Sequence, residues 1–293
     1  LKSWLIAPQR YWLEQLQLQP KEWINPLEDL ERLDLTELQR HQLLNESLEE
    51  LINLLNNNKD RSINSVHRES WEKKFLGQGT LPPSSAGSLE CEILEKRWLH
   101  LKATIQNLGS FNKKILFLNN EYEEILWAGN FVIVIELGKL KSKSVMKGWL
   151  NHLLISASNN SSTGTLVIAR SSKKSKINNY EVALKWDPIP QKQAEKELSK
   201  IKSLVQNGIK YCWPVPPVSG WEFIKNNQKD PIKATTAFKQ SWNGTYNHQG
   251  ERDTPEMKLC FGANYEFENF INNETFHEAC LNLYKPLIKS LNP

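Results

Sequence analysis

The fold is decided by the stretch Tyr122-Glu-Glu-Ile-Leu-Trp-Ala-Gly129-Asn-Phe-Val-Ile-Val-Ile-Glu136-Leu-Gly-Lys139. It contains two short apolar runs, Glu123 to Trp127 and Phe131 to Ile135, which are divided at Gly129. Short apolar runs rich in β-branched and aromatic residues are typical of strands. The stretch therefore predicts two consecutive strands, and a third is expected upstream at Lys114 to Leu118.

This stretch has the layout of a metal-dependent nuclease core of the restriction-enzyme type, but it lacks the acids of such a core. Two carboxylates would hold Mg²⁺ beside the scissile phosphate, and a Lys one residue after the second acid would help to polarise water. Here Asn130 follows Gly129, and two residues separate Glu136 from Lys139. Because side chains alternate along a strand, Glu136 and Lys139 are expected on opposite faces. The sequence predicts a scaffold with no catalytic residues and no metal site.

Composition permits one large domain or two smaller ones. Of the 293 residues 39% are hydrophobic, and the eleven Trp predict packing anchors. The net charge of +4 is too small for a nucleic-acid footprint that covers the whole chain. The four Cys form no C-x-x-C pair, which favours reduced, buried thiols over a metal site or disulfides.

The predicted location is the cytoplasm, with no membrane contact. No apolar run approaches the roughly 20 residues that span a bilayer, and no signal-peptide pattern opens the chain. Since the sequence begins at Leu1 rather than Met, we expect an internal or C-terminal piece of a larger protein.

Hydrophobic periodicity predicts helices before and after the strands. The order of the elements predicts an α/β fold, a small mixed sheet flanked by helices, in a single domain over residues 1–293. Leu35 to Leu55 is the clearest helix, with Asp34 as its N-cap and Glu37 completing a capping-box-like pattern. The other expected helices are Lys2 to Leu18 with an interruption at Pro8, Asn64 to Phe75, Ser88 to Asn107, Lys143 to Ser156, Pro190 to Asn207, Pro231 to Trp242 and Glu274 to Ser290. The remaining expected strands are Thr165 to Ala169 and Tyr180 to Trp186, and Asn119-Asn120 is an expected tight turn.

The longest acid-free stretch lies between Glu136 and Glu181. A region of one sign raises the local anion concentration and would follow a phosphate backbone. The candidate DNA-binding residues are Lys139, Lys141, Lys143, Lys147, Arg170, Lys173, Lys174 and Lys176. The open alternatives are subunit docking, or a solvated face with a flexible polar loop at Ser171 to Asn179. That loop carries no aromatic residue, which counts against a base-stacking platform.

Two histidines and one acidic tetrapeptide are weighed as further sites. His152 has no nucleophile or metal partner at a suitable spacing, so a structural role with a hydrogen bond to a neighbouring element is favoured, and the same holds for His41. Gly250-Glu-Arg-Asp253 contains two acids, and an ion pair that fixes the turn is favoured over a metal loop.

Aromatic residues suggest two further surfaces. Tyr211-Cys-Trp-Pro-Val-Pro-Pro217 could bind a partner groove as polyproline II, but packing within its own domain through Trp213 and Trp221 is favoured. The N-terminal helix could form an exposed interface for other subunits. Its aromatic residues, with one nearby, are Trp4, Tyr11, Trp12 and Trp23.

Six segments in order carry a resemblance to a known family. They are Trp4-Leu-Ile-Ala-Pro-Gln-Arg-Tyr-Trp-Leu-Glu-Gln-Leu16, Leu38-Gln-Arg-His-Gln-Leu-Leu44, Gly79-Thr-Leu-Pro-Pro-Ser-Ser-Ala-Gly87, Trp149-Leu-Asn-His-Leu-Leu-Ile-Ser-Ala157, Gly208 to Pro217, and Ala237-Phe-Lys-Gln-Ser-Trp242 followed by Gly250-Glu-Arg-Asp253. The ordered set resembles the C-terminal domain of RecC, the gamma subunit of exodeoxyribonuclease V, over essentially the whole chain. No single segment is specific.

The resemblance implies a restriction-endonuclease-like (PD-(D/E)XK-type) core that is catalytically dead. It implies a RecBCD-type helicase-nuclease that processes double-strand breaks for recombination, in which RecC clamps the other subunits, helps to split the duplex and scans for Chi. The implied partners are RecB- and RecD-like subunits and forked or single-stranded DNA. ATP and Mg²⁺ would act on the partner subunits, so no cofactor and no enzyme activity are expected of this chain.

Two alternatives remain open from the residues themselves. An active Mg²⁺-dependent DNA nuclease would use Glu136, Lys139 and an acid such as Glu123 or Glu124. A pure protein-interaction module would make no DNA contact.

Overall fold

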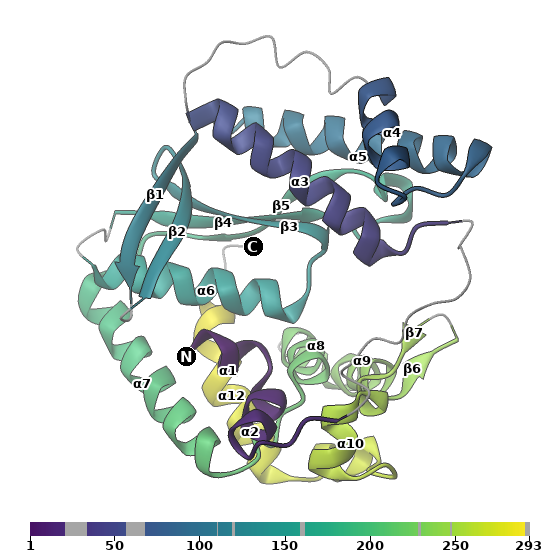
Figure 1. Cartoon of the computed structure of the whole chain (residues 1–293). Coiled ribbons are helices and arrows are strands. Elements are labelled where there is room, and N and C mark those ends of the chain that lie inside the picture. The colour runs from purple at the N-terminus through teal and green to yellow at the C-terminus, as the bar shows by residue number, and fades with distance from the viewer. Residues whose placement is uncertain are drawn as a thin grey trace. The chain divides into compact units, whose positions relative to one another are not determined.

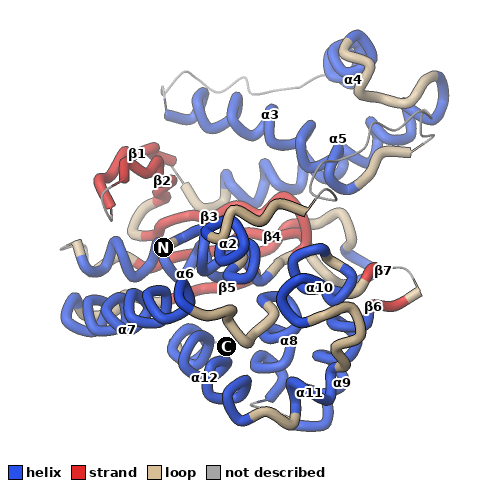
Figure 2. The backbone as a smooth tube through the Cα atoms, turned by 60° about the horizontal axis from the view of Figure 1, so that its bottom comes forward, coloured by secondary structure: helices blue, strands red, loops and turns tan. Residues whose placement is uncertain are grey.

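The chain forms two compact units, each assembled from separate stretches of sequence (Figures 1 and 2). The computed structural model describes residues 1–20, 34–56, 68–109, 111–118, 121–158, 162–227, 230–246 and 248–290. Unit 1 comprises Leu1–Pro26, Lys141–Ser162 and Trp186–Pro293, and unit 2 comprises Leu27–Leu140 and Thr163–Lys185. A single domain over residues 1–293 stays a prediction, because compactness alone does not show whether either unit folds by itself.

Unit 2 is built on a five-stranded mixed sheet whose strands follow sequence order. The strands are β1 (Phe111–Leu118), β2 (Glu121–Ala128), β3 (Phe131–Lys139), β4 (Gly164–Arg170) and β5 (Tyr180–Trp186). The first three form an antiparallel meander, and β4 pairs parallel to β3. The α/β class with a small mixed sheet is therefore confirmed, and all five predicted strands are present. The predicted turn at Asn119-Asn120 lies outside the described residues.

Three helices of unit 2 share one hydrophobic cluster with a single face of this sheet. They are α3 (Glu37–Asn56), α4 (Arg68–Gly77) and α5 (Ser84–Gln106), and Figure 1 shows α3 and α5 on the same side of the strands. The cluster takes Ile133 from β3 and Leu166 from β4, which are register partners. Because side chains alternate along a strand, Leu137 and Ile168 join the same face.

The start of α3 differs from the sequence prediction. Thr36, not Asp34, caps the helix: its hydroxyl accepts a bond from the Gln39 amide at 3.2 Å, and the Gln39 side chain accepts one from the Thr36 amide at 2.9 Å. This reciprocal pair is a capping box two residues later than predicted. The prediction for Asp34 and Glu37 was therefore wrong, and the Glu37 carboxylate is available for another role.

The fifth helix also starts earlier than the predicted Ser88. Gly87, expected to end a loop, lies inside the first turn of α5. A Cβ at this position would lie 2.3 Å from the carbonyl oxygen of Pro82. Glycine is required here because the preceding loop passes directly against the helix.

Unit 1 is helical and is packed by aromatic side chains. Its helices are α1 (Lys2–Ile6), α2 (Pro8–Gln15), α6 (Ser142–Ala157), α7 (Gln191–Lys210), α8 (Pro217–Asn227), α9 (Pro231–Asn243), α10 (Pro255–Phe261), α11 (Phe267–Ile271) and α12 (Glu274–Lys289). The predicted interruption at Pro8 is confirmed, since Pro8 opens α2. The sequence did not predict α8, α10, α11 or the short hairpin of β6 (Gly244–Thr245) and β7 (His248–Gln249).

Most tryptophans pack in the interior, as their number predicted. The buried ones are Trp4, Trp71, Trp98, Trp127, Trp149, Trp186, Trp213, Trp221 and Trp242. In unit 1 the Phe238 ring meets Phe270 at 5.5 Å and Phe276 at 5.3 Å. Aromatic pairs at these separations prefer tilted and edge-on geometries, which fix the helices against one another.

None of the four cysteines forms a disulfide, and only two of them have the buried position that was predicted for all four. Cys91 and Cys280 are buried, whereas Cys212 and Cys260 are half-buried. None of the helices in the described part of the chain has the length and apolar character of a membrane span.

Candidate nucleic-acid interface

Most of the predicted DNA-binding side chains are exposed. Lys139 ends β3, Lys141 immediately precedes α6, Lys143 and Lys147 lie in its first turns, and Lys173 and Lys176 lie between β4 and β5. The side chain of Lys174 lies outside the described part of the structure. Lys139, Lys173 and Lys176 belong to unit 2, whereas Lys141, Lys143 and Lys147 belong to unit 1.

Sheet register brings Lys139 beside the start of the loop from Ser171 to Asn179, which we call the basic loop. Strands β3 and β4 run parallel, so their C-terminal ends meet at the same edge of the sheet. Lys139 is the register partner of Arg170, and Ser171 follows directly. Lys139 and the basic loop together form a positively charged edge of unit 2. Local spacing in the sequence did not predict that Lys139 lies next to this loop.

Among the predicted residues whose side chains the structure describes, Arg170 is the exception. Its side chain is 6% exposed, and its guanidinium donates to the Glu37 carboxylate at 2.7 Å. A buried, paired guanidinium cannot present its charge to a phosphate in solvent. We therefore remove Arg170 from the DNA-contacting set.

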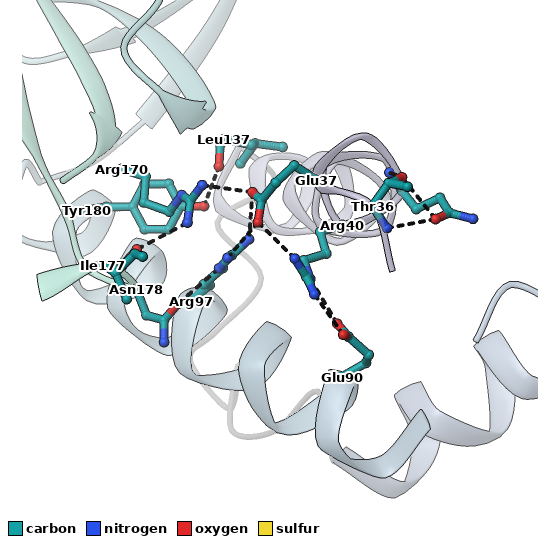
Figure 3. Close-up of polar contacts among 11 residues, drawn as sticks. Thr36, Glu37, Arg40, Glu90, Arg97, Leu137, Arg170, Ile177, Asn178 and Tyr180 are labelled. Carbon is teal, nitrogen blue, oxygen red and sulfur yellow. Dashed lines mark hydrogen bonds and ion pairs between the residues drawn. The ribbon is translucent and has the colours of Figure 1, made fainter. Parts of the chain in front are cut away.

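Glu37 is the centre of a cluster of charges that we call the Glu37 cluster: Glu37, Arg40, Glu90, Arg97 and Arg170. Arg97 forks onto both carboxylate oxygens at 3.0 and 3.2 Å, and Arg40 donates at 2.9 Å. Figure 3 shows the three guanidiniums converging on this one carboxylate. Arg40 also forks onto Glu90 at 2.7 and 2.8 Å. Such forked, charge-assisted bonds are the strongest that side chains make.

The same arginines hold the basic loop. Arg170 donates to the carbonyl of Ile177 at 3.3 Å, and Arg97 donates to the Asn178 side chain at 3.1 Å (Figure 3). The loop closes on itself where the Ser171 amide donates to the Asn179 carbonyl at 2.8 Å. The expected flexible segment is therefore tied to α5 and β4 at its C-terminal half.

Electrostatics in the Glu37 cluster favour its charged state. Burial alone would raise the pKa of Glu37, but the hydrogen bonds and charges of Arg97, Arg170 and Arg40 outweigh it and lower that pKa to about 2. Burial, with the nearby charge of Arg97, lowers the pKa of Arg170. Burial also raises the pKa of Tyr180 to about 12, and its hydroxyl donates to the Leu137 carbonyl at 2.7 Å.

The acid on β3 at the place of a nuclease's catalytic acid, Glu136, is mostly buried. Glu136 is 7% exposed, accepts a bond from the Gly138 amide at 3.0 Å and lies 3.9 Å from the His41 imidazole. Glu124 pairs with Lys113 at 2.6 Å. Within the described ranges, no three His, Cys, Asp or Glu side chains are grouped so that they could hold a metal. The side chain of Glu123 lies outside the described part.

The pairing of β3 with β4 becomes irregular between Glu136 and Lys139. Glu136 pairs with Ala169 and Lys139 with Arg170, so three steps along β3 match one step along β4. Simple alternation of side chains does not hold across such an interruption. The placement of Glu136 and Lys139 on opposite faces of the sheet therefore stays a prediction.

The two other candidate sites have structural roles. The His152 ring stacks on Trp149 at 5.6 Å and on Trp186 at 6.2 Å, and burial lowers its pKa to about 4 despite the opposing charge of Asp187. In the Gly250 to Asp253 segment, Arg252 forms ion pairs with Glu266 at 3.8 Å and with Asp253 at 4.0 Å, as the prediction of a loop ion pair requires. Glu251 has a different role, since its carboxylate accepts bonds from the amides of Val218 and Ser219.

The aromatic N-terminus packs inside unit 1. Trp4 is fully buried and meets Trp213 edge-on at 5.1 Å. Gln9 donates to the carbonyls of Trp213 at 2.8 Å and Val215 at 2.9 Å, which holds the Pro-rich segment against α2. Internal packing of that segment is therefore confirmed, and an exposed interface through Trp4 was wrong. Trp23 lies outside the described residues.

The Glu37 cluster was missed from the sequence. The spacing of Glu37 and Arg40 by three residues on a helix was the only local signal, and it normally indicates a solvated pair. Arg97 and Arg170 join them from α5 and β4. Only the tertiary structure shows that these three arginines share the Glu37 carboxylate.

The geometry defines a class of protein: a mixed α/β scaffold with a positively charged sheet edge held by buried arginines. Among known families, the sequence model of the RecC C-terminal domain matches residues 1–228 of the 293, and the chain belongs to that family. Membership places it in a RecBCD-type complex, with other subunits and DNA, that processes DNA breaks. A comparison with curated proteins finds no match. The last of the six segments that carried the resemblance, residues 237–242 with 250–253, lies outside the residues that the family model matches.

Proposed function

We propose that this chain is a non-catalytic, DNA-handling domain of its RecBCD-type complex. In this role it positions forked or single-stranded DNA through exposed lysines and docks RecB- and RecD-like subunits, which carry the ATP- and Mg²⁺-dependent chemistry. The observation that carries the DNA role is the positively charged sheet edge of Lys139, Lys173 and Lys176, with no acid in the sequence between Glu136 and Glu181.

The architecture supports a restriction-endonuclease-like core that no longer holds a metal. The sheet has a three-stranded meander followed by a parallel strand, and Asn130 stands at the turn where a nuclease would place an acid. A hydrolytic site needs at least two carboxylates around the ion. Glu136 instead lies against the Gly138 amide and the His41 ring.

DNA affinity measured against salt tests this function. We would titrate a fluorescein-labelled forked duplex with the 293-residue chain at several salt concentrations. Each lost phosphate contact should flatten the plot of log K against log salt by about 0.9. The Lys139→Ala, Lys173→Ala, Lys176→Ala triple variant should therefore flatten it by up to about three units.

Two further triple variants complete the test. Lys141→Ala, Lys143→Ala, Lys147→Ala probes the lysines at the start of α6. Lys192→Ala, Lys196→Ala, Lys202→Ala removes three exposed charges from α7 and controls for net charge. If the salt slope is unchanged both in the Lys139, Lys173, Lys176 variant and in the Lys141, Lys143, Lys147 variant, the DNA role is overturned and a protein-interaction module is favoured. If the α7 variant loses as much salt slope as these two, the attraction to DNA is unspecific.

A further inference from the structure

We infer that Glu37 is a positioning residue for DNA contact: its carboxylate fixes the basic loop, through Arg97 and Arg170, so that Lys173 and Lys176 are presented in one arrangement. This inference rests on the proposed function, since it concerns how the same lysines meet phosphate. Neither Glu37 nor its arginines would touch the DNA.

A continuous path of bonds leads from the carboxylate to the loop. Glu37 holds Arg170 at 2.7 Å and Arg97 at 3.0 Å. Arg170 in turn holds the Ile177 carbonyl, and Arg97 holds the Asn178 side chain (Figure 3). Within the loop, the Lys176 amide donates to the Lys173 carbonyl at 3.0 Å, and the Asn179 amide donates to the Lys176 carbonyl at 2.9 Å. The two lysines are thus bonded into the same short turn that the arginines anchor.

Within the described residues, the other acids near Glu37 already have partners: Glu136 accepts a bond from the Gly138 amide at 3.0 Å. Glu90, the second acid of the Glu37 cluster, is occupied by the fork of Arg40. The Arg97 and Arg170 side chains are only 5% and 6% exposed, whereas Glu37 is 53% exposed, so the two guanidiniums depend on the carboxylate as their counter-charge at the edge of the solvent. The Nε atom of Arg170 already lacks a hydrogen-bond partner within the described structure. Without the carboxylate, two buried guanidiniums would repel each other and draw Ile177 and Asn178 apart.

Holding the loop matters because binding to a pre-ordered surface costs less entropy. A loop that is loose in the free protein has to be ordered when DNA binds, and its affinity falls accordingly. The number of phosphates neutralised does not change, because the lysines are still present. Loosening the loop should therefore weaken affinity without changing the salt slope.

The test compares Glu37→Gln with Glu46→Gln. Glu46 lies on the same helix, exposed at 48% and paired with Lys74 at 3.6 Å, so both variants remove one negative charge. On charge alone, both should bind DNA slightly tighter. We expect Glu37→Gln to bind the labelled forked duplex about two- to tenfold more weakly at an unchanged salt slope, which corresponds to ordering one side chain on binding. Glu46→Gln should bind equally or slightly tighter.

Hydrogen exchange of the free chain gives a readout that does not involve DNA. The amides of Ser171, Lys176 and Asn179 should exchange faster in Glu37→Gln than in Glu46→Gln. Circular dichroism would first establish that each variant is folded. Should Glu37→Gln not fold, Arg97→Lys keeps the charge but loses the fork, and the same loosening of the loop is expected.

The outcomes separate the two proposals. If the lysine variants flatten the salt slope but Glu37→Gln changes neither amide exchange nor affinity, the positioning role is overturned and the DNA role stands. If the lysine variants do not change the salt slope, the DNA role is overturned, whatever the exchange data show. The proposal that Glu37 presents the lysines to phosphate is then overturned with it. Faster exchange together with weaker binding at constant slope supports the inference.

Discussion

The carboxylate of Glu251 accepts two bonds from Ser219, at 2.7 Å from the backbone amide and 2.6 Å from the hydroxyl. Ser219 lies in the first turn of α8, the last helix within the family-matched residues 1–228, whereas Glu251 lies beyond them. The first amides of a helix have no partner within the helix, and a negative charge there is favoured by the helix dipole. A residue beyond the family-matched part of the chain therefore caps the N-terminus of a helix that lies within the matched part.

Replacing Glu251 by Ala should destabilise unit 1. The buried amide of Ser219 and the part-buried amide of Val218 would lose their acceptor, which costs on the order of 1–3 kcal/mol. Urea unfolding followed by Trp fluorescence measures this loss. Asp253→Ala, two residues away and 40% exposed, is the matched control and should change stability by less than about 0.5 kcal/mol. Equal effects of the two changes would contradict the capping role.

Gly208→Ala should be costly because Trp4 occupies the space of a Cβ. A Cβ on Gly208 would lie 2.1 Å from the Trp4 ring, which is fully buried. Overpacking of this kind costs roughly 1–3 kcal/mol. The control is Gly77→Ala, where a Cβ meets nothing within 4 Å, and it should be neutral or slightly stabilising. Differential scanning calorimetry should show a lowered Tm for the first variant only.

His152 should make stability depend on pH between its ordinary pKa of 6.5 and its folded value of about 4. The folded pKa is depressed, so in this window the unfolded chain binds more protons than the folded one. Stability is therefore complete above pH 6.5 and is lost as the pH falls toward 4, by roughly 3 kcal/mol. Urea midpoints of the wild type and His152→Gln, measured from pH 4 to 7.5, should converge as the pH falls. Parallel curves would argue against a neutral buried imidazole.

Glu37 should act in a lower pH window. Its folded pKa of about 2 lies below the ordinary 4.5, so it stabilises the folded state fully above pH 4.5. That contribution is lost as the pH falls from 4.5 toward 2, when the carboxylate takes up a proton and releases Arg97 and Arg170. The stability difference between the wild type and Glu37→Gln should shrink over this range. If the stability difference between the two proteins stays constant down to pH 2, the arginines do not depend on the negative charge of Glu37.

The purified chain should not cleave DNA with Mg²⁺ or Mn²⁺. Glu136, the acid at the nuclease-like position, contacts Gly138 and lies near His41, and Glu124 is paired with Lys113. Labelled linear and forked duplexes, incubated with each metal and resolved on denaturing gels, provide the measurement. Cleavage that disappears in Glu136→Ala would establish the active nuclease and refute the scaffold.

Local patterns were sufficient for the elements whose signal lies within one segment. The apolar runs of β2 and β3, the period of α3 and the break at Pro8 all follow from neighbouring residues. Helices α10 and α11 were missed because they have only 7 and 5 residues, too few to show a helical period, so their packing partners stabilise them. Helix α8 was missed because Pro217 and Gly220 in its first turn read as part of a loop. The N-cap of α3 was placed at Asp34 because Asp and Thr are both good caps, and sequence alone does not choose between them.

The amino-acid sequence by itself determined the α/β class, the five strands, the family resemblance and the acid-free basic stretch, since each depends on residues close together in the chain or on their order. Only the tertiary structure decided that Arg170 is buried rather than DNA-facing, and that Glu37 gathers Arg40, Arg97 and Arg170 from three separate elements. Glu37 and Arg170 are 133 residues apart. The physical reason is that an ion pair depends on the distance between two charges in space and on the burial of the groups around them, and neither is encoded in local spacing.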